Sequence, residues 1–121
     1  MGSSVALLDE LQTVGCRRLI FSSSATVYGG SAVSPITEST PTGAGITNAY
    51  GRTKYVIEEM LQDFSGSPKG RGWGIVVLRY FNPVGAHPSG LMGEDPSGPP
   101  NNLMPYVAQV GFIIDVGWRL N

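Results

Sequence analysis

The sequence predicts an α/β fold in which two parallel strands lie in one sheet and a helix connects them. Three observations predict it: a short apolar run at residues 19–21, a helical apolar pattern at residues 49–64, and a second apolar run at residues 75–78. Parallel strands need a crossover connection, which is usually a helix. Strand, helix and strand therefore form a βαβ unit, the building block of a doubly wound parallel sheet.

A short helix is expected before the first strand. Leu7, Leu11 and Val14 follow the spacing i, i+4, i+7, and Gly15 stands where a helix can end in the left-handed conformation. The apolar run at residues 19–21 then suits a strand buried on both faces. Three serines follow this run, so its carboxyl end is expected to open into a polar site.

The most regular apolar pattern predicts a helix over residues 49–64. Its apolar side chains follow the spacing i, i+3, i+4, i+7 and are Ile57, Met60, Leu61 and Phe64. One stripe of this helix therefore faces a core. Glu58 and Glu59 are expected on the opposite, solvated face.

The chain after this helix predicts a second strand, a long loop and a last helix. The run at residues 75–78 is too short for an isolated helix and rich in β-branched residues. Residues 82–102 contain five prolines and four glycines, and a loop this long usually has a functional reason. Asn102 could then cap a helix that carries Leu103, Val107 and Val110 on one face.

Composition and charge exclude several functions. The 121 residues carry 8 basic and 9 acidic side chains, and proteins that bind nucleic acid or anionic membranes have a clustered basic excess. One cysteine cannot form an intramolecular disulfide, and no secretory signal or long apolar run occurs, which predicts a cytoplasmic protein outside the membrane. His87 is the single histidine and has no further ligand nearby, so no metal site is expected.

Tyr50 and Lys54 lie four residues apart near the start of the predicted helix, so their side chains share one face. A free tyrosine has a pKa of about 10, and burial raises it, so a tyrosine that acts as a base near neutrality needs a nearby cation. Lys54 would supply this cation. An ordinary amphipathic helix with a solvated first turn explains the short pattern equally well.

Hydroxyl side chains at the end of the first strand add weight to the catalytic interpretation. Ser22, Ser23 and Ser24 follow the apolar run, and ligands of open α/β sheets bind beyond the carboxyl ends of strands. A hydroxyl there can reach both a tyrosine and a substrate hydroxyl. A strand-end turn would also explain three serines, so only their combination with Tyr50 and Lys54 favours chemistry.

Three stretches of the chain match a known family. They are FSSSATVYG at residues 21–29, NAYGRTKYVIEEML at residues 48–61, and LRYFNPVGAHPSGLMGEDPSGPPNNLMPY at residues 78–106. From about Val5 to Val110 the chain resembles the UDP-glucose 4-epimerase family of the extended short-chain dehydrogenase/reductase superfamily. The tyrosine–lysine pair is common to the superfamily, whereas the third stretch is specific. The resemblance implies a partial Rossmann-like fold, namely the central βαβ unit plus a substrate loop.

The resemblance also implies roles for individual residues. Tyr50 would take the proton from the sugar 4-hydroxyl while a hydride passes to NAD, and Lys54 would hold the nicotinamide ribose. Ser24, beside Thr26, would relay or position the proton, and Phe81 would border the nicotinamide. The other contacts to the UDP-sugar would come from Asn82, Asn102 and Leu103. The implied reaction interconverts UDP-glucose and UDP-galactose through a 4-keto intermediate.

The chain also departs from the family's pattern. No G-x-x-G-x-x-G occurs in it, although the family uses this glycine-rich turn to approach the NAD pyrophosphate. We therefore expect residues 1–110 to be an internal part of an NAD-dependent epimerase/dehydratase domain that lacks the N-terminal glycine-rich half, and residues 111–121 to be a divergent tail. Two strands without neighbours leave both sheet edges unpaired, which predicts low stability of the isolated chain. Without the glycine-rich turn, NAD would lose most of its backbone hydrogen bonds, so the isolated chain is expected to have little or no epimerase activity.

Two other functions stay open. Another nucleotide-sugar epimerase, dehydratase or decarboxylase would share the hydroxyl, tyrosine and lysine residues, although such enzymes typically add a carboxylate pair where this chain has Ala25 and Thr26. A noncatalytic fragment that binds UDP-sugar weakly is the other. The resemblance implies UDP-glucose or UDP-galactose as the partner, and it allows a homodimer of the complete protein.

Overall fold

The computed structural model describes residues 2–94 and 97–110. The chain divides after Phe81 into two units. The tail expected at residues 111–121 lies outside the described residues.

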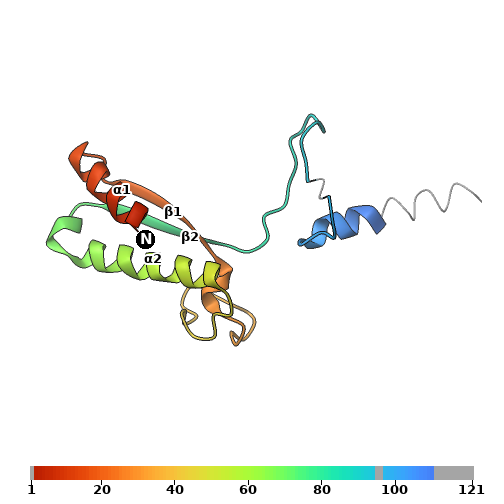
Figure 1. Ribbon diagram of the computed structural model, residues 1–121, viewed down its shortest axis with the longest axis horizontal. Coiled ribbons are helices and arrows are strands. Elements are labelled where there is room, and N and C mark those ends of the chain that lie inside the picture. The colour runs from red at the N-terminus through yellow and green to blue at the C-terminus, as the bar shows by residue number, and fades with distance from the viewer. Residues whose placement is uncertain (1, 95–96, 111–121) are drawn as a thin grey trace, which may run out of the picture. The chain divides into compact units, whose positions relative to one another are not determined.

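The first unit contains two helices and two strands that alternate along the chain (Figure 1). The elements are α1 (Gly2–Thr13), β1 (Arg18–Ser24), α2 (Ala49–Gly66) and β2 (Gly74–Tyr80), with 3-10 turns η1 (Ala25–Tyr28) and η2 (Pro68–Gly70). All four predicted helices and strands of this unit are confirmed, each with slightly different bounds. The glycine at the end of α1 has the expected left-handed backbone, with a φ of 73° at Gly15.

The two strands pair in parallel, as the sequence predicts. Three cross-strand pairs include side chains that meet α2, and they are Leu19 with Ile75, Phe21 with Val77, and Ser23 with Arg79. The first two pairs are apolar, and the third is polar and lies near the carboxyl ends of the strands. The face below α2 therefore changes from apolar to polar as it approaches the strand ends.

A small apolar core holds α1 and α2 against this face of the sheet. Its buried members are Leu8 of α1 with Ile57 and Leu61 of α2, and Met60 and Phe64 pack against them half-buried. The predicted apolar stripe of α2 is therefore confirmed. Figure 1 shows α2 running alongside the two strands.

The opposite face of the sheet is exposed in the part of the chain that the structure describes. Ile20 is 68% exposed, and Val76, Leu78 and Tyr80 of β2 are also exposed. The prediction that the first strand is buried on both faces is therefore wrong for the described residues. The physical reason is that both helices pack through the single cluster around Leu61, which covers one face only.

The loop between η1 and α2 is fastened to η1 by backbone hydrogen bonds. Gly43 N donates to Val27 O at 2.9 Å, and Gly30 N donates to Gly45 O at 3.1 Å. Val27 is completely buried under this loop. Asn48 then begins α2, because its side-chain Oδ1 accepts from Gly51 N at 2.7 Å.

The second unit contains the predicted loop and the predicted last helix. Residues 82–94 and 97–102 hold neither helix nor strand, and residues 103–110 form a helix directly after Asn102. Within the described residues, no helix is both long and apolar enough to cross a membrane. The same residues contain no group of three histidine, cysteine or acidic side chains that could hold a metal ion.

Candidate active site

The first turns of α2 place Tyr50 and Lys54 next to each other, on the shared face that their spacing predicts. The Lys54 ammonium nitrogen lies 5.5 Å from the centre of the Tyr50 ring and 5.0 Å from the centre of the Phe21 ring. It also donates a hydrogen bond of 2.7 Å to the backbone oxygen of Ser22 in β1. Lys54 is therefore a fixed cation between a phenol and the end of a strand.

The Tyr50 side chain is open to solvent in the first unit. It is 57% exposed, although it lies in a helix whose other face forms the core. A phenol in this position is accessible to a ligand that binds beyond the carboxyl end of β1. Its exposure also means that little of the packing of the fold depends on it.

Ser24 ends β1 and receives two hydrogen bonds from Thr26. Thr26 N donates to Ser24 Oγ at 3.3 Å, and Thr26 Oγ1 donates to the same oxygen at 3.0 Å. A serine hydroxyl has two acceptor lone pairs and one proton. Because Thr26 supplies donors for both lone pairs, the Ser24 hydroxyl is left to act as a donor to a further group.

Gly51 allows the start of α2 to approach η1 closely. A Cβ added at Gly51 would lie 2.9 Å from Ile46 Cγ2 and 3.0 Å from Thr26 Oγ1, closer than side-chain atoms normally pack. Thr26 is the residue that binds Ser24, and Gly51 directly follows Tyr50. The structure therefore brings the Tyr50–Lys54 pair and the Ser24–Thr26 pair to neighbouring positions.

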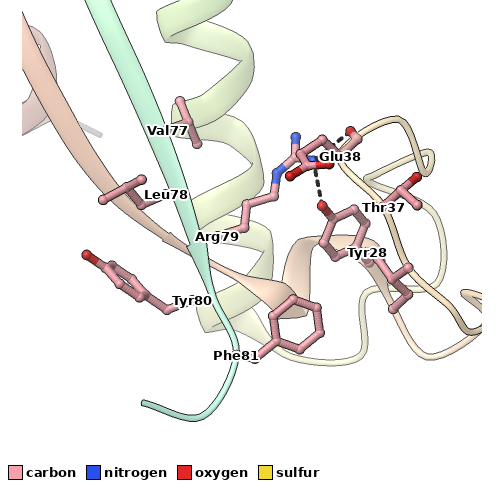
Figure 2. Close-up of a pocket in the computed structure, with 9 residues that line it drawn as sticks. Tyr28, Thr37, Glu38, Val77, Leu78, Arg79, Tyr80 and Phe81 are labelled. Atoms are coloured by element: carbon pink, nitrogen blue, oxygen red, sulfur yellow. Dashed lines mark hydrogen bonds between the residues drawn. The ribbon is translucent and has the colours of Figure 1, made fainter. Parts of the chain in front are cut away.

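Phe81 lies beside a cavity at the end of β2 that is distinct from these two pairs. Its ring stacks on Tyr28, with 6.4 Å between the ring centres, and together they border a space of about 520 Å³ (Figure 2). The lining includes Thr37, Glu38 and Arg79, but not Tyr50, Lys54 or Ser24. Of the predicted site residues, Phe81 alone lines this cavity.

The remaining predicted substrate residues belong to the second unit. Asn82 is its first residue, and Asn102 and Leu103 stand at the start of the helix over residues 103–110. The Asn102 side-chain nitrogen donates to Glu94 Oε1 at 3.3 Å. Their meeting with Tyr50 around a substrate stays a prediction.

The expectation that Glu58 lies on the solvated face of α2 is wrong. Glu58 is 8% exposed and forms an ion pair of 2.8 Å with Arg79. The hydrogen bond to Glu58 raises the pKa of the Arg79 guanidinium above its ordinary value; partial burial acts in the opposite direction, and a hydrogen bond to Tyr28 adds to the rise. The sequence places Glu58 at the border of the apolar stripe, because Glu58 and Leu61 are three residues apart and such side chains are neighbours on a helix surface.

Comparison with known proteins gives the class of this chain. The family model described as "NAD dependent epimerase/dehydratase family" matches residues 1–109. The chain therefore belongs to the NAD-dependent epimerase/dehydratase family, and its parallel βαβ unit agrees with that assignment.

The particular relatives are UDP-glucose 4-epimerases. The chain is 55% identical over 111 residues to the one of Caenorhabditis elegans, and 58% identical over 107 residues to UDP-glucose 4-epimerase 2 of Arabidopsis thaliana. These matches cover 91% and 88% of this chain but 31% and 29% of the relatives, so the chain spans about a third of their length.

A solved structure with the same fold is the UDP-glucose 4-epimerase of Stenotrophomonas maltophila with bound NAD and formylated UDP-arabinopyranose. It is 50% identical and has a TM-score of 0.74 over 93% of this chain and 32% of its own. The predicted Rossmann-like fold class is thereby confirmed for the part of the fold that this chain contains.

Proposed function

We propose that this chain supplies the catalytic base and the substrate loop of an NAD-dependent UDP-glucose 4-epimerase, an isomerase that interconverts UDP-glucose and UDP-galactose. The observation that carries the proposal is the identity of more than half of the aligned residues to UDP-glucose 4-epimerases. The tyrosine–lysine geometry at the start of α2 supports it, because an epimerase needs a base for the sugar hydroxyl.

In this proposal the three residues at the strand end divide the proton chemistry among them. Tyr50 accepts the proton of the sugar 4-hydroxyl and later returns it. The Lys54 ammonium, 5.5 Å from the ring, stabilises the phenolate electrostatically. Ser24 holds the sugar oxygen or the phenolate with its hydroxyl proton, which Thr26 leaves free to donate.

The residues of this chain fit the nicotinamide end of NAD. When bound, NAD would accept a hydride from the sugar carbon and return it to the opposite face. An exposed phenol, an adjacent ammonium and the exposed ring of Phe81 offer a cation and apolar surface to such a group. Ser24, Tyr50, Lys54 and Phe81 are the residues that would hold it, whereas the chain contains no glycine-rich turn for the pyrophosphate.

The proposal extends to the substrate loop, the partners and the location. Asn82, Asn102 and Leu103 would hold the sugar and diphosphate of the UDP-sugar, and Thr26 would stand beside Ser24 at the sugar. Residues 1–110 would be the partial epimerase domain. A homodimer of the complete protein and a cytoplasmic location also belong to the proposal.

A chimaera tests the proposed function with this chain's own residues. Residues 1–109 replace the equivalent segment of the Stenotrophomonas enzyme, and conversion of UDP-glucose to UDP-galactose is followed in a coupled assay. We expect a kcat within about tenfold of the parent enzyme, a change below about 1.4 kcal/mol in activation free energy. A folded chimaera that binds UDP-glucose without converting it would contradict the proposal and favour a noncatalytic segment.

Gly51→Ala in this chimaera is expected to lower kcat by about tenfold or more. The new methyl group would press against Ile46 and Thr26 and move the start of α2 away from Ser24, and small displacements of reacting groups are costly. Gly66→Ala is the control, because a Cβ at that end of the same helix meets nothing within 4 Å. Equal kcat values for the two variants would show that the close approach at Gly51 has no catalytic consequence.

A further inference from the structure

Glu58 is a buried carboxylate beside the small core. It is 8% exposed, and the helix positions around it, Ile57 and Leu61, form the buried cluster with Leu8. An ionised group in such a place is costly unless charge and hydrogen bonds compensate for the lost water. The hydrogen-bond and charge partners of Glu58 therefore determine its role in the structure.

Both carboxylate oxygens of Glu58 have partners from the sheet. Arg79 of β2 donates to it three times, from Nε to Oε1 at 3.2 Å, from Nε to Oε2 at 3.1 Å and from Nη2 to Oε2 at 2.8 Å. The hydroxyl of Ser23 in β1 donates to Oε1. Ser23 and Arg79 are opposite each other in the strand register, so a single carboxylate of α2 holds both strands at one level.

The candidate catalytic residues lie close to the Ser23–Arg79 pair along the strands. Lys54 stands one helical turn before Glu58 and holds Ser22 O at 2.7 Å, while Glu58 holds the adjacent Ser23. Ser24 is the next residue of the same strand. Lys54 and Glu58, on two successive turns of α2, thus form hydrogen bonds with Ser22 and Ser23 of β1. These two bonds fix the position of the helix along the strand.

The network also reaches η1 through Arg79. Arg79 Nη1 donates to the Tyr28 hydroxyl at 3.0 Å, and Figure 2 shows this contact beside Glu38. Tyr28 is the last residue of η1, the turn that begins directly after Ser24. Glu58 is therefore connected to both sides of Ser24, through Ser23 before it and through Arg79 and Tyr28 after it.

We propose that Glu58 is a positioning residue, which sets the place of Tyr50 and Lys54 relative to Ser24 by clamping α2 to β1 and β2. The inference rests on the proposed function and adds to it a residue that touches neither substrate nor cofactor. Gln at this position keeps the size of the side chain but presents an amide to the Arg79 donors and removes the charge that holds them.

The kinetic test is Glu58→Gln in the chimaera. We expect kcat to fall roughly ten- to hundredfold, as misplaced catalytic groups do, with the KM for UDP-glucose changed by less than about twofold. The matched control is Glu59→Gln, one residue further on. The Glu59 side chain is exposed and accepts a hydrogen bond from Tyr55, so this variant should retain the kcat of the chimaera. Ser23→Ala, which leaves the Glu58–Arg79 pair intact, should lower kcat by a smaller factor.

A chemical test reads the position of Lys54 without any turnover. The folded chimaera is treated with a trace of acetic anhydride, and acetylation of Lys54 is compared by mass spectrometry with that of Lys69 in η2. Glu58→Gln should raise the Lys54 to Lys69 ratio by about two- to tenfold, the range expected from loss of one hydrogen bond. Glu59→Gln should leave the ratio unchanged.

The two measurements separate the inference from the proposed function. Unchanged kcat and unchanged Lys54 acetylation in Glu58→Gln would overturn the positioning role, even in an active chimaera. If the folded chimaera is inactive, the proposed function falls, and the acetylation ratio alone decides the inference. If Glu58→Gln does not fold, Ser23→Ala is tested instead. The proposal would then be overturned if Ser23→Ala had the kcat and the Lys54 to Lys69 acetylation ratio of the unsubstituted chimaera.

Discussion

Tyr50→Phe in the chimaera is expected to lower kcat by about 10²- to 10⁴-fold, the contribution of a positioned general base. The substitution removes the phenolic oxygen that would take the sugar proton and leaves the ring beside Lys54. Because the Tyr50 side chain is 57% exposed, the melting temperature should stay that of the chimaera. Steady-state kinetics with UDP-glucose and a thermal melt measure the two effects.

Tyr55→Phe provides the matched control for this experiment. Tyr55 lies in the same helix, and its hydroxyl donates to Glu59 Oε1 at 2.6 Å rather than facing Lys54. The same change of side chain should therefore leave kcat nearly unchanged. If Tyr50→Phe retained kcat within about tenfold of the chimaera, Tyr50 would not be the base, since general base catalysis contributes more than that.

Arg79→Met is expected to cause the largest loss of stability, about 2–3 kcal/mol in the free energy of unfolding. Removal of one partner of a buried ion pair leaves the other charge without compensation, and a fully buried pair would cost more. Here the Arg79 side chain is 25% exposed, so water moderates the loss. Urea denaturation of the chimaera measures it, with Arg52→Met at an exposed position of α2 as the control.

The double variant Glu58→Gln with Arg79→Met isolates the ion pair. Once the carboxylate is an amide, loss of the guanidinium no longer leaves a buried charge, so the double variant should be at least about 1 kcal/mol more stable than the sum of the single losses implies. Strict additivity of the two single effects would mean that Glu58 and Arg79 contribute independently.

The βαβ unit could be predicted because its signals are local. Ile57, Leu61 and Phe64 repeat with the helical period, and the run at residues 75–78 is too short for an isolated helix and rich in β-branched residues. The exposed face of the sheet could not be predicted from such signals. An apolar residue such as Ile20 indicates a strand, but only the arrangement of helices around it decides which face they cover.

The candidate site was predictable to the same degree. The spacing of Tyr50 and Lys54 placed them together, because four residues make one helical turn. The burial of Glu58 depends on a contact between segments distant in sequence, because its partner Arg79 is 21 residues away. The role of Thr26 as a donor to Ser24 is a contact over two residues, but it depends on the turn that η1 makes directly after β1. Acidic side chains are rarely buried, so a local rule places Glu58 in water.

The uncovered face of the two strands affects how much of this polypeptide can accumulate in a cell. Ile20 and Val76 stand side by side in the register, and both point away from the helices into water. Exposed apolar side chains beside unpaired strand edges bind chaperones and promote aggregation. Wherever these residues are made without a covering layer, we expect holdase capture or degradation to limit their abundance before catalysis is ever at issue.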